Sequence, residues 1–199
     1  MPAIQTAFRS AERFTQDEFL RWLEEHGSML TGTCELIGGS IVMAPPAGYP
    51  HSSVVTRLLC AIADHVRARR LGEVEAPGAG YELPSGDTLE PDVSFLSNAR
   101  LERGPRPRRG EMFRIVPDLV VEVLSPSTQR YDRSEKKALY ARNGVDEYWL
   151  VDAAERTVTV LQRRGDVYDD GVVYRDGEIR SRVLPGLVLD VAEVFAGIP

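Results

Sequence analysis

Two acidic residues stand in otherwise apolar, strand-like runs of the sequence. Asp92 lies near the start of the run at 91–96, and Glu122 lies near the end of the run at 119–124. An isolated ionised carboxylate in a buried strand is costly, so each group needs a partner. If the two strands are antiparallel neighbours, the carboxylates converge and repel each other, which favours a hard divalent cation. The spacing leaves a second interpretation open, in which each carboxylate is solvated at a strand end or paired with an arginine.

Lys136 is a candidate for assisting Glu122. A helix is expected to start at Asp132, which with Glu135 has the spacing of a capping box. Because a crossover helix begins near the carboxyl end of the preceding strand, its first turn should lie close to Glu122, with Lys136 in or just past that turn. Lys137 points about 100° away and is expected in solvent. Taken alone, Lys136 would also fit an ordinary surface charge.

The remaining elements follow from hydrophobic periodicity and turn residues. Two helices and a hairpin with a Gly-Gly turn precede the acidic pair. The strand after the Lys136 helix is expected to lie parallel to the Glu122 strand, because strand, helix and strand form a right-handed crossover. The expected elements are helices at 15–27, 55–70, 132–143 and 191–195, strands at 34–37, 41–43, 91–96, 119–124 and 147–152, and an antiparallel meander between 158 and 184.

Composition and length indicate one globular domain. The chain has 199 residues, of which 27% are charged and 43% hydrophobic. Residues 1–13 lack a periodic pattern and are expected to form a loose arm before a single domain over 14–199. The formal charge of −6 argues against non-specific coating of nucleic acid, although not against local binding. No apolar run approaches the roughly 20 residues that span a membrane, and Cys34 and Cys60 have no metal or disulfide spacing, so a cytoplasmic protein is expected.

Several motifs occur in an order and spacing that resemble a known family. These motifs are Glu35-Leu36-Ile37-Gly38-Gly39, His51, Pro91-Asp92, the run from Pro117 to Thr128 around Glu122, Lys136 before Leu139-Tyr140, Gly144-Val145, and the run from Glu147 to Asp152. They look like the Uma family of restriction endonuclease-like proteins, a branch of the PD-(D/E)XK nuclease superfamily. The similarity covers nearly the whole chain, from about Phe14 to Phe195.

The resemblance implies a restriction-endonuclease-like fold of the mixed α/β (α+β) class. Its core would be a mixed central sheet flanked by helices, with extra antiparallel strands near both ends. The resemblance also implies a magnesium or manganese ion held by Asp92, Glu122 and the main-chain carbonyl of Val123. Lys136 would position the attacking water or offset charge in the transition state, and Glu35 would be an additional acid. The implied activity is that of a magnesium-dependent endodeoxyribonuclease, and the implied assembly is a homodimer.

The sequence departs from the superfamily's plain motif at Leu124, where a lysine is expected. The family is similar in this respect, with its lysine relocated to the next helix, so the role is carried to Lys136. Asp118 also follows a proline, but it lies about 13 Å from Glu122 along one strand, at about 3.3 Å per residue, which is too far to share an ion. His51 could be a ligand or a proton carrier, or it could cap the following helix.

Other interpretations remain open at this stage. Glu35 also fits a cross-strand partner for a base, and the six arginines of the exposed loop at 98–114 could contact phosphates or remain solvated. A second hypothesis of function is a catalytically silent nuclease-like fold that binds nucleic acid or protein. Nucleophilic catalysis by Ser125 or Ser127 lacks a suitable base, and a glycosidase would leave Lys136 without a role.

Overall fold

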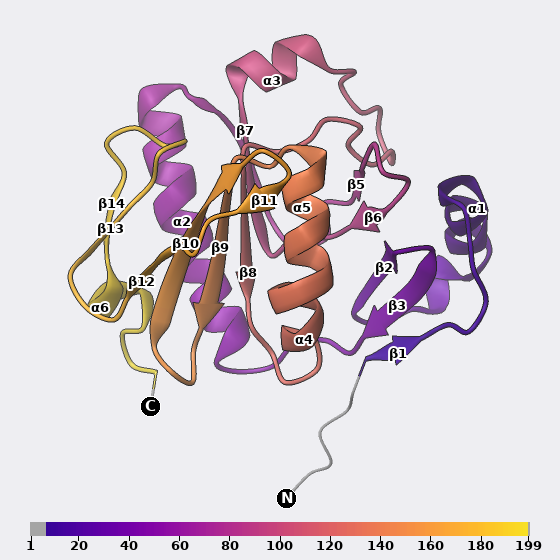
Figure 1. The fold of residues 1–199 in the computed structure, drawn as a ribbon, viewed down its shortest axis with the longest axis horizontal. Helices are drawn as coiled ribbons and strands as arrows, with labels where there is room; N and C mark the ends of the chain where they lie inside the picture. Colours follow the sequence, from indigo (N-terminus) through magenta and orange to yellow (C-terminus); the bar gives the residue numbers. More distant parts are fainter. Residues whose placement is uncertain (1–6, 199) are drawn as a thin grey trace, which may run out of the picture.

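The main element of the computed structural model, which describes residues 7–198, is a seven-stranded mixed sheet (Figure 1). Its strand order is β11-β10-β9-β8-β7-β4, and β12 also pairs with β10. The middle strand β8 runs antiparallel to β7 and parallel to β9. The strands of this sheet are β4 (Gly72–Glu75), β7 (Val93–Ser97), β8 (Leu119–Val123), β9 (Glu147–Asp152), β10 (Thr157–Arg164), β11 (Val167–Tyr168) and β12 (Val172–Tyr174).

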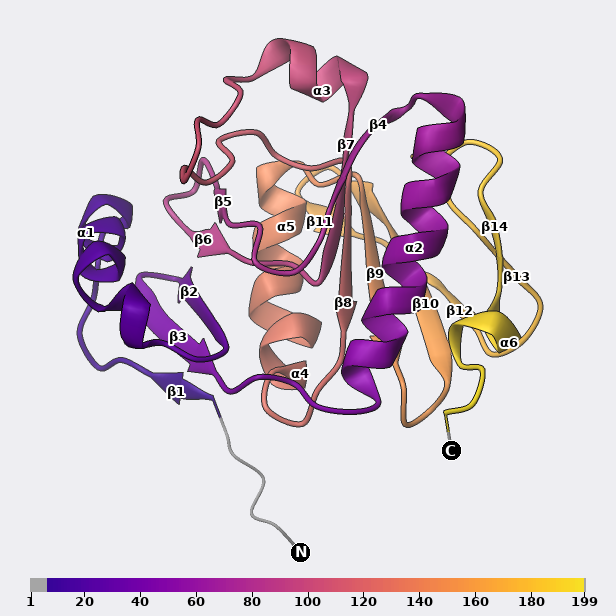
Figure 2. The same ribbon diagram turned by 180° about the vertical axis from the view of Figure 1, so that it is seen from behind.

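Helices cover both faces of this sheet (Figures 1 and 2). One face packs against α2, and the other packs against a continuous helical segment that connects β8 to β9. This connection makes β8 and β9 parallel, as the sequence predicts. The covering helices are α2 (His51–Arg69) on one side, and α4 (Gln129–Tyr131), a π-helical turn (Asp132–Lys136) and α5 (Lys137–Asn143) on the other.

Side chains of β8 alternate between the two faces. Val121 belongs to the core cluster that includes the apolar side of α2, whereas Val120 and Leu124 belong to the cluster that includes α5. All five residues of β8 are buried, which confirms the prediction of a strand covered on both faces. Glu122 lies two residues from Val120 and from Leu124, so it points toward the α5 side.

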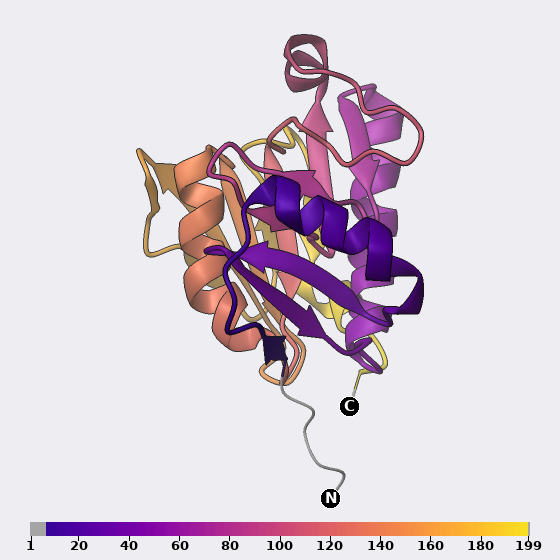
Figure 3. The same ribbon diagram turned by 90° about the vertical axis from the view of Figure 1, so that its right-hand side faces the viewer.

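A second, five-stranded sheet lies beside the first and brings in the hairpin that carries Glu35. Its order is β1-β3-β2-β6-β5. Helix α1 lies across the hairpin (Figure 3) and buries Phe19 against Cys34 and Leu36. The capping box of Thr15 and Glu18 forms at its start, as predicted. The elements of this layer are β1 (Phe8–Arg9), α1 (Gln16–His26), a 3-10 turn (Gly27–Met29), β2 (Thr33–Ile37), β3 (Ser40–Ala44), β5 (Tyr81–Glu82) and β6 (Thr88–Leu89).

Shorter elements complete the chain. Ile179, Leu189 and Val194 extend the core on the α2 side of the main sheet. Within residues 7–198, no helix has both the length and the apolarity to cross a bilayer. The shorter elements are α3 (Asn98–Arg103), β13 (Glu178–Arg180), β14 (Val188–Asp190) and α6 (Val191–Val194).

The fold class predicted from the sequence is confirmed. A mixed central sheet is flanked by helices, and antiparallel strands are added near both ends of the chain. That residues 14–199 form a single domain stays a prediction. The loop expected at 98–114 differs at its start, where Ser97 caps α3 by accepting a hydrogen bond from the N–H of Arg100.

The loose arm expected over residues 1–13 differs from the structure in its second half, because Phe8 and Arg9 form β1. They pair with Met43 and Val42 of β3. Arg9 also forms an ion pair with Glu135 at 2.9 Å, which ties the strand to the helical segment. Residues 1–6 of the expected arm lie outside the described residues.

The helix expected to start at Asp132 begins three residues earlier, at Gln129. The proposed capping box is therefore wrong, because Asp132 lies inside the helical segment with its side chain buried. The physical reason is the preceding turn, in which the Ser125 carbonyl accepts the N–H groups of Thr128 and Gln129 and so starts the helix early. The predicted end is confirmed, since Gly144 adopts a left-handed conformation at φ 90°.

Candidate active site

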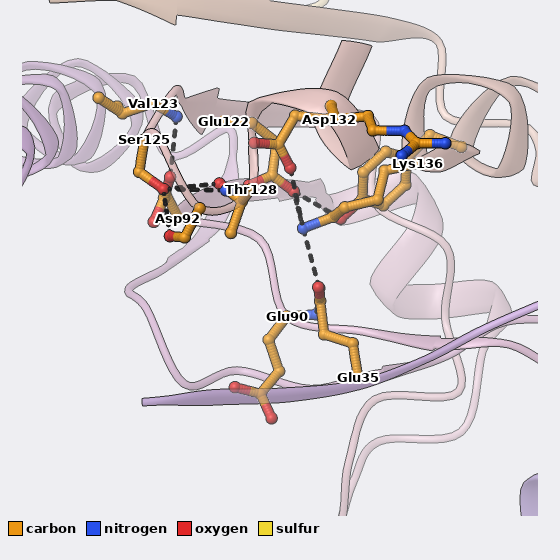
Figure 4. A network of polar contacts seen from close by, with 12 residues as sticks. Glu35, Glu90, Asp92, Glu122, Val123, Ser125, Thr128, Asp132 and Lys136 are labelled. Carbon is orange, nitrogen blue, oxygen red and sulfur yellow. Dashed lines mark hydrogen bonds and ion pairs between the residues drawn. The ribbon is translucent and has the colours of Figure 1, made fainter. Parts of the chain in front are cut away.

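A cleft of about 320 Å³ opens at the carboxyl end of β8. Four of the segments that line it are the end of β8, the segment that enters β7, strand β2 and the π-helical turn. They contribute, in that order, Glu122, Asp92, Glu35 and Lys136. Figure 4 shows the carboxyl groups of Glu122 and Glu35 on opposite sides of the Lys136 amine. A larger hollow of about 790 Å³ adjoins the cleft at His51.

Asp92 lies across the sheet from Glu122. The register of β7 and β8 pairs Val93 with Val121, so the next residues, Asp92 and Glu122, oppose each other. The main-chain N–H of Val123 donates a hydrogen bond to Asp92 Oδ2 at 2.8 Å and fixes the direction of this carboxylate. The antiparallel pairing that brings the two acids together is therefore present.

Three carboxylates surround the Lys136 ammonium, and the side chain of Lys136 is only 4% exposed. Its Nζ atom is 2.7 Å from Glu122 Oε1, 2.9 Å from Glu35 Oε1 and 3.7 Å from Asp132 Oδ1. Burial by itself would lower the pKa of Lys136, but attraction by these three acids outweighs it and raises the pKa well above its ordinary value. The amine is therefore charged and held in place.

Glu122 is fixed through one of its oxygens. Tyr140 donates its hydroxyl to Glu122 Oε1 at 3.0 Å, and Lys136 contacts the same atom. Burial raises the pKa of Glu122 well above its usual range, Lys136 opposes this shift, and the neighbouring carboxylates of Asp132 and Asp92 add to it. The cleft thus holds more acidic groups than its one ammonium can balance, and the raised pKa of Glu122 reflects burial together with this excess.

Glu35 reaches the same amine from the second sheet. Its Oε1 also accepts the main-chain N–H of Glu90 at 2.8 Å. Across the hairpin its partner in register is Val42, so Glu35 is not the cross-strand partner of a base. Burial, followed by repulsion from Glu35, raises the pKa of Glu90 to about 7. Glu90 is a cleft residue that no sequence pattern indicates.

Asp132 is the second cleft residue that sequence analysis missed. Its side chain is buried, and burial raises its pKa to about 6, against the opposing effect of Lys136 and a hydrogen bond with Thr128. Its i, i+4 spacing from Lys136 could have placed both side chains on one helix face. The capping-box pattern gave a competing explanation for the same residue.

The donor set of the cleft fits a hard divalent cation. Oxygen ligands suit magnesium and manganese, and a cation would relieve the mutual repulsion of the acids. Within residues 7–198, no group of three or more His, Cys, Asp or Glu side chains is placed to hold a metal ion. A cation between two carboxylates would therefore also need main-chain or water ligands. The carboxylates that line the cleft are Glu35, Glu90, Asp92, Glu122 and Asp132.

His51 occupies part of this space. Its Nε2 atom lies 3.2 Å from Asp92 Oδ2, and the ring also hydrogen-bonds the main chain of Val123. Burial would lower the pKa of His51, but Asp92 and Val123 together raise it. The side chain makes no cap for α2, so that alternative is wrong. A cation that used the Val123 carbonyl would compete with this ring.

Comparison with known proteins places the chain in a family. The family model Uma2, described as "Putative restriction endonuclease", matches residues 16–192. The chain belongs to the Uma2 family. It is also 29% identical over 158 residues to an uncharacterized protein of Synechocystis, covering 77% of this chain and 76% of that protein. Membership agrees with the resemblance seen in the sequence motifs.

A solved structure supports the fold of this Uma2 protein. It is that of a protein from Anabaena variabilis described as a "putative nuclease belonging to DUF820", with a TM-score of 0.74 and 24% sequence identity. The match covers 92% of this chain and 97% of that chain. At this level of identity the likeness establishes the architecture alone.

The Uma2 chain lacks an amine at position 124, because Leu124 packs into the core on the α5 side. The amine of Lys136 reaches Glu122 from the following helical segment instead. If the superfamily's lysine has moved from position 124 to the next helix, its amine must still reach Glu122, and the amine of Lys136 does so. The catalytic and metal-binding roles of Asp92, Glu122, Lys136 and Glu35 stay predictions.

The arginine-rich segment of the Uma2 chain includes a residue engaged far from the cleft. Arg100 forms ion pairs with Asp118 at 3.1 Å and Asp146 at 2.7 Å. Asp118 directly precedes β8, about 13 Å from Glu122 at about 3.3 Å per residue. Arg100 therefore joins elements at the opposite end of the strand.

We expect Arg100→Ala to reduce stability without affecting the cleft. The substitution leaves Asp118 without its cation, whereas Asp146 keeps its ion pair with Arg163 at 2.8 Å. Unfolding in urea should therefore show a loss of roughly 1–3 kcal/mol. The arrangement of the cleft should stay as in wild type, because no contact of Arg100 lies near it. Unchanged stability would contradict the structural role assigned to Arg100.

Proposed function

We propose that this Uma2 protein is a magnesium- or manganese-dependent endodeoxyribonuclease that hydrolyses DNA phosphodiester bonds. The observation that carries the proposal is the buried Lys136 ammonium, 2.7 Å from Glu122 and 2.9 Å from Glu35, in a cleft where Asp92 opposes Glu122. A buried cation among carboxylates at the end of a central strand is an arrangement that stability alone does not require. The family supports the nuclease class.

The residues of the cleft divide the work of phosphodiester hydrolysis. Asp92, Glu122 and the carbonyl of Val123 would hold the divalent cation. When bound, this cation supplies Lewis-acid activation of the phosphodiester and of the attacking water. Lys136 donates its N–H groups to that water or to a phosphate oxygen, where negative charge grows in the transition state. Glu35 holds the amine in position.

Charge makes the same cation necessary for substrate entry. Five acids line the cleft against Lys136 and His51, and those that are ionised repel a phosphate group. A divalent cation reverses that balance locally. DNA should therefore enter the cleft only when magnesium or manganese is present.

The proposal includes a homodimer in the cytoplasm. A dimer would present two clefts, one to each strand of duplex DNA. Cys34 and Cys60 are free thiols, which is consistent with a reducing compartment. Size-exclusion chromatography with light scattering measures the assembly directly.

We expect the protein to nick or linearise supercoiled plasmid DNA in magnesium or manganese, and to leave it intact in EDTA or calcium. The measurement is gel electrophoresis over time, with DNA binding followed separately by fluorescence anisotropy. Binding without cuts in either activating metal would support the second candidate, a catalytically silent fold that binds nucleic acid or protein. One observation favours that candidate: His51 already contacts Asp92 and the main chain of Val123.

A further inference from the structure

The two carboxylate oxygens of Asp132 have different surroundings. The residue is 1% exposed and lines the cleft. Thr128 forms a hydrogen bond with its side chain. Its Oδ1 is the one buried side-chain nitrogen or oxygen atom within residues 7–198 that has no hydrogen-bond partner, and it lies 3.7 Å from Lys136 Nζ. This oxygen faces an ammonium group that it does not reach.

The Lys136 ammonium has a donor left for this oxygen. An ammonium group carries three N–H donors. Glu122 and Glu35 lie at hydrogen-bond distance from it, at 2.7 and 2.9 Å, and Asp132 is the third and most distant of its acid partners. A buried carboxylate oxygen without a hydrogen-bond partner is unfavourable, so its presence in the cleft needs a functional reason.

We propose that Asp132 is a positioning residue that accepts the Lys136 ammonium when Glu122 turns toward a divalent cation. The inference rests on the proposed function and adds a residue to the same site. A divalent cation bound by Glu122 would take up the negative charge that now pairs with Lys136. It would also repel the ammonium at close range. Glu35 and Asp132 are the two carboxylates that then keep the amine inside the cleft.

The main chain around Asp132 is already fixed, so only a side chain has to move. Tyr148 donates its hydroxyl to the main-chain oxygen of Asp132 at 3.0 Å. The π-helical turn spans Asp132 to Lys136, and both of these end residues are buried. π-Helical turns inside helices are frequent at functional sites. A small shift of either side chain would close the 3.7 Å separation.

The test is a double-mutant cycle on Mn²⁺ affinity, measured by calorimetry. If Asp132 acts through Lys136, Asp132→Asn should weaken Mn²⁺ binding about tenfold or more when the lysine is present. In a Lys136→Met background, the same change should weaken binding less than about threefold. An equal loss in both backgrounds would mean that the charge of Asp132 acts through space, and it would overturn the proposal. Asp118→Asn, at the far end of β8, is the control and should leave Mn²⁺ affinity unchanged.

A second readout needs no lysine variant. The chain contains only two lysines, Lys136 and Lys137, so ¹⁵N-lysine labelling gives two side-chain ammonium signals. Without metal, wild type and Asp132→Asn should both show a Lys136 signal protected from exchange. At saturating Mg²⁺, wild type should keep this protection and Asp132→Asn should lose it. Protection that persists in the variant overturns the proposal, and Asp132→Ser serves as the variant if asparagine prevents folding.

The outcomes separate this inference from the proposed function. If the wild-type protein binds Mn²⁺ and shows the expected ammonium signals without cutting DNA, the result disproves the nuclease activity and still supports the role of Asp132. If the wild type cuts DNA and Asp132→Asn has the same Mn²⁺ affinity and the same ammonium signals, only the role of Asp132 is disproved. Failure of the wild type to bind either ion would overturn both.

Discussion

Lys136→Met is expected to lower DNA cleavage by about 10²–10³-fold or more, because it removes the one ammonium group that can offset charge in the transition state. The same change should reduce the free energy of unfolding by about 3–5 kcal/mol at neutral pH. The reason is that Glu35, Glu122 and Asp132 are buried around the amine and would face one another without a cation. Plasmid cleavage and urea unfolding measure the two effects.

Lys137→Met is the matched control, since it makes the same chemical change at the neighbouring residue. Lys137 is half-buried, so stability should change by no more than about 0.5 kcal/mol and cleavage should be unaffected. Lys136→Arg gives a sharper test. A planar guanidinium cannot replace a compact ammonium among converging carboxylates. Lys136→Arg should therefore be as inactive as Lys136→Met, although it keeps the positive charge. Full cleavage by Lys136→Met would disprove the role assigned to the amine.

Glu122→Gln is expected to abolish metal-dependent cleavage, by about 10³-fold or more, while changing stability by less than about 1 kcal/mol. The amide oxygen can still accept hydrogen bonds from Tyr140 and Lys136, which now share Glu122 Oε1. Removing a negative charge also relieves repulsion in the cleft. Mn²⁺ affinity should fall about 10–100-fold, as measured by calorimetry.

Glu147→Gln is the control for this prediction, because it places the same change in a buried position of the neighbouring strand. Glu147 accepts hydrogen bonds from the Trp149 indole, the Gln162 amide and the main-chain N–H of Arg182, all at 2.7 Å. Losing the charge there should lower stability by about 1–3 kcal/mol without affecting Mn²⁺ affinity. If both variants lose metal affinity equally, the loss reports general destabilisation and Glu122 is not a ligand.

Much of the fold could be predicted because its signals are local. The apolar run around Glu122 predicts a strand buried on both faces, and the Gly-Gly turn predicts the hairpin of β2 and β3. The left-handed conformation of Gly144 ends α5 where the sequence indicates. The parallel pairing of β8 and β9 also follows, because a helix between two strands restricts their relative direction.

Contacts between distant segments could not be predicted in the same way. Phe8 and Arg9 carry no strand pattern, and β1 forms because β3 offers an unpaired edge and Glu135 offers an ion pair. The side chain of His51 turns to Asp92 instead of capping α2, because the cleft supplies a carboxylate within reach. Such choices depend on which partners the folded chain brings close.

The sequence by itself determined that Asp92 and Glu122 stand in strand-like runs and would converge if those strands were antiparallel neighbours. The structure supplied that pairing and its register. The sequence also placed Lys136 in the segment that follows Glu122. Only the tertiary structure decided that Asp132 lies in the cleft, that Glu35 arrives from a second sheet, and that one ammonium is left among an excess of acids. The physical reason is that electrostatic energy depends on distances and burial in space, and a sequence pattern records neither.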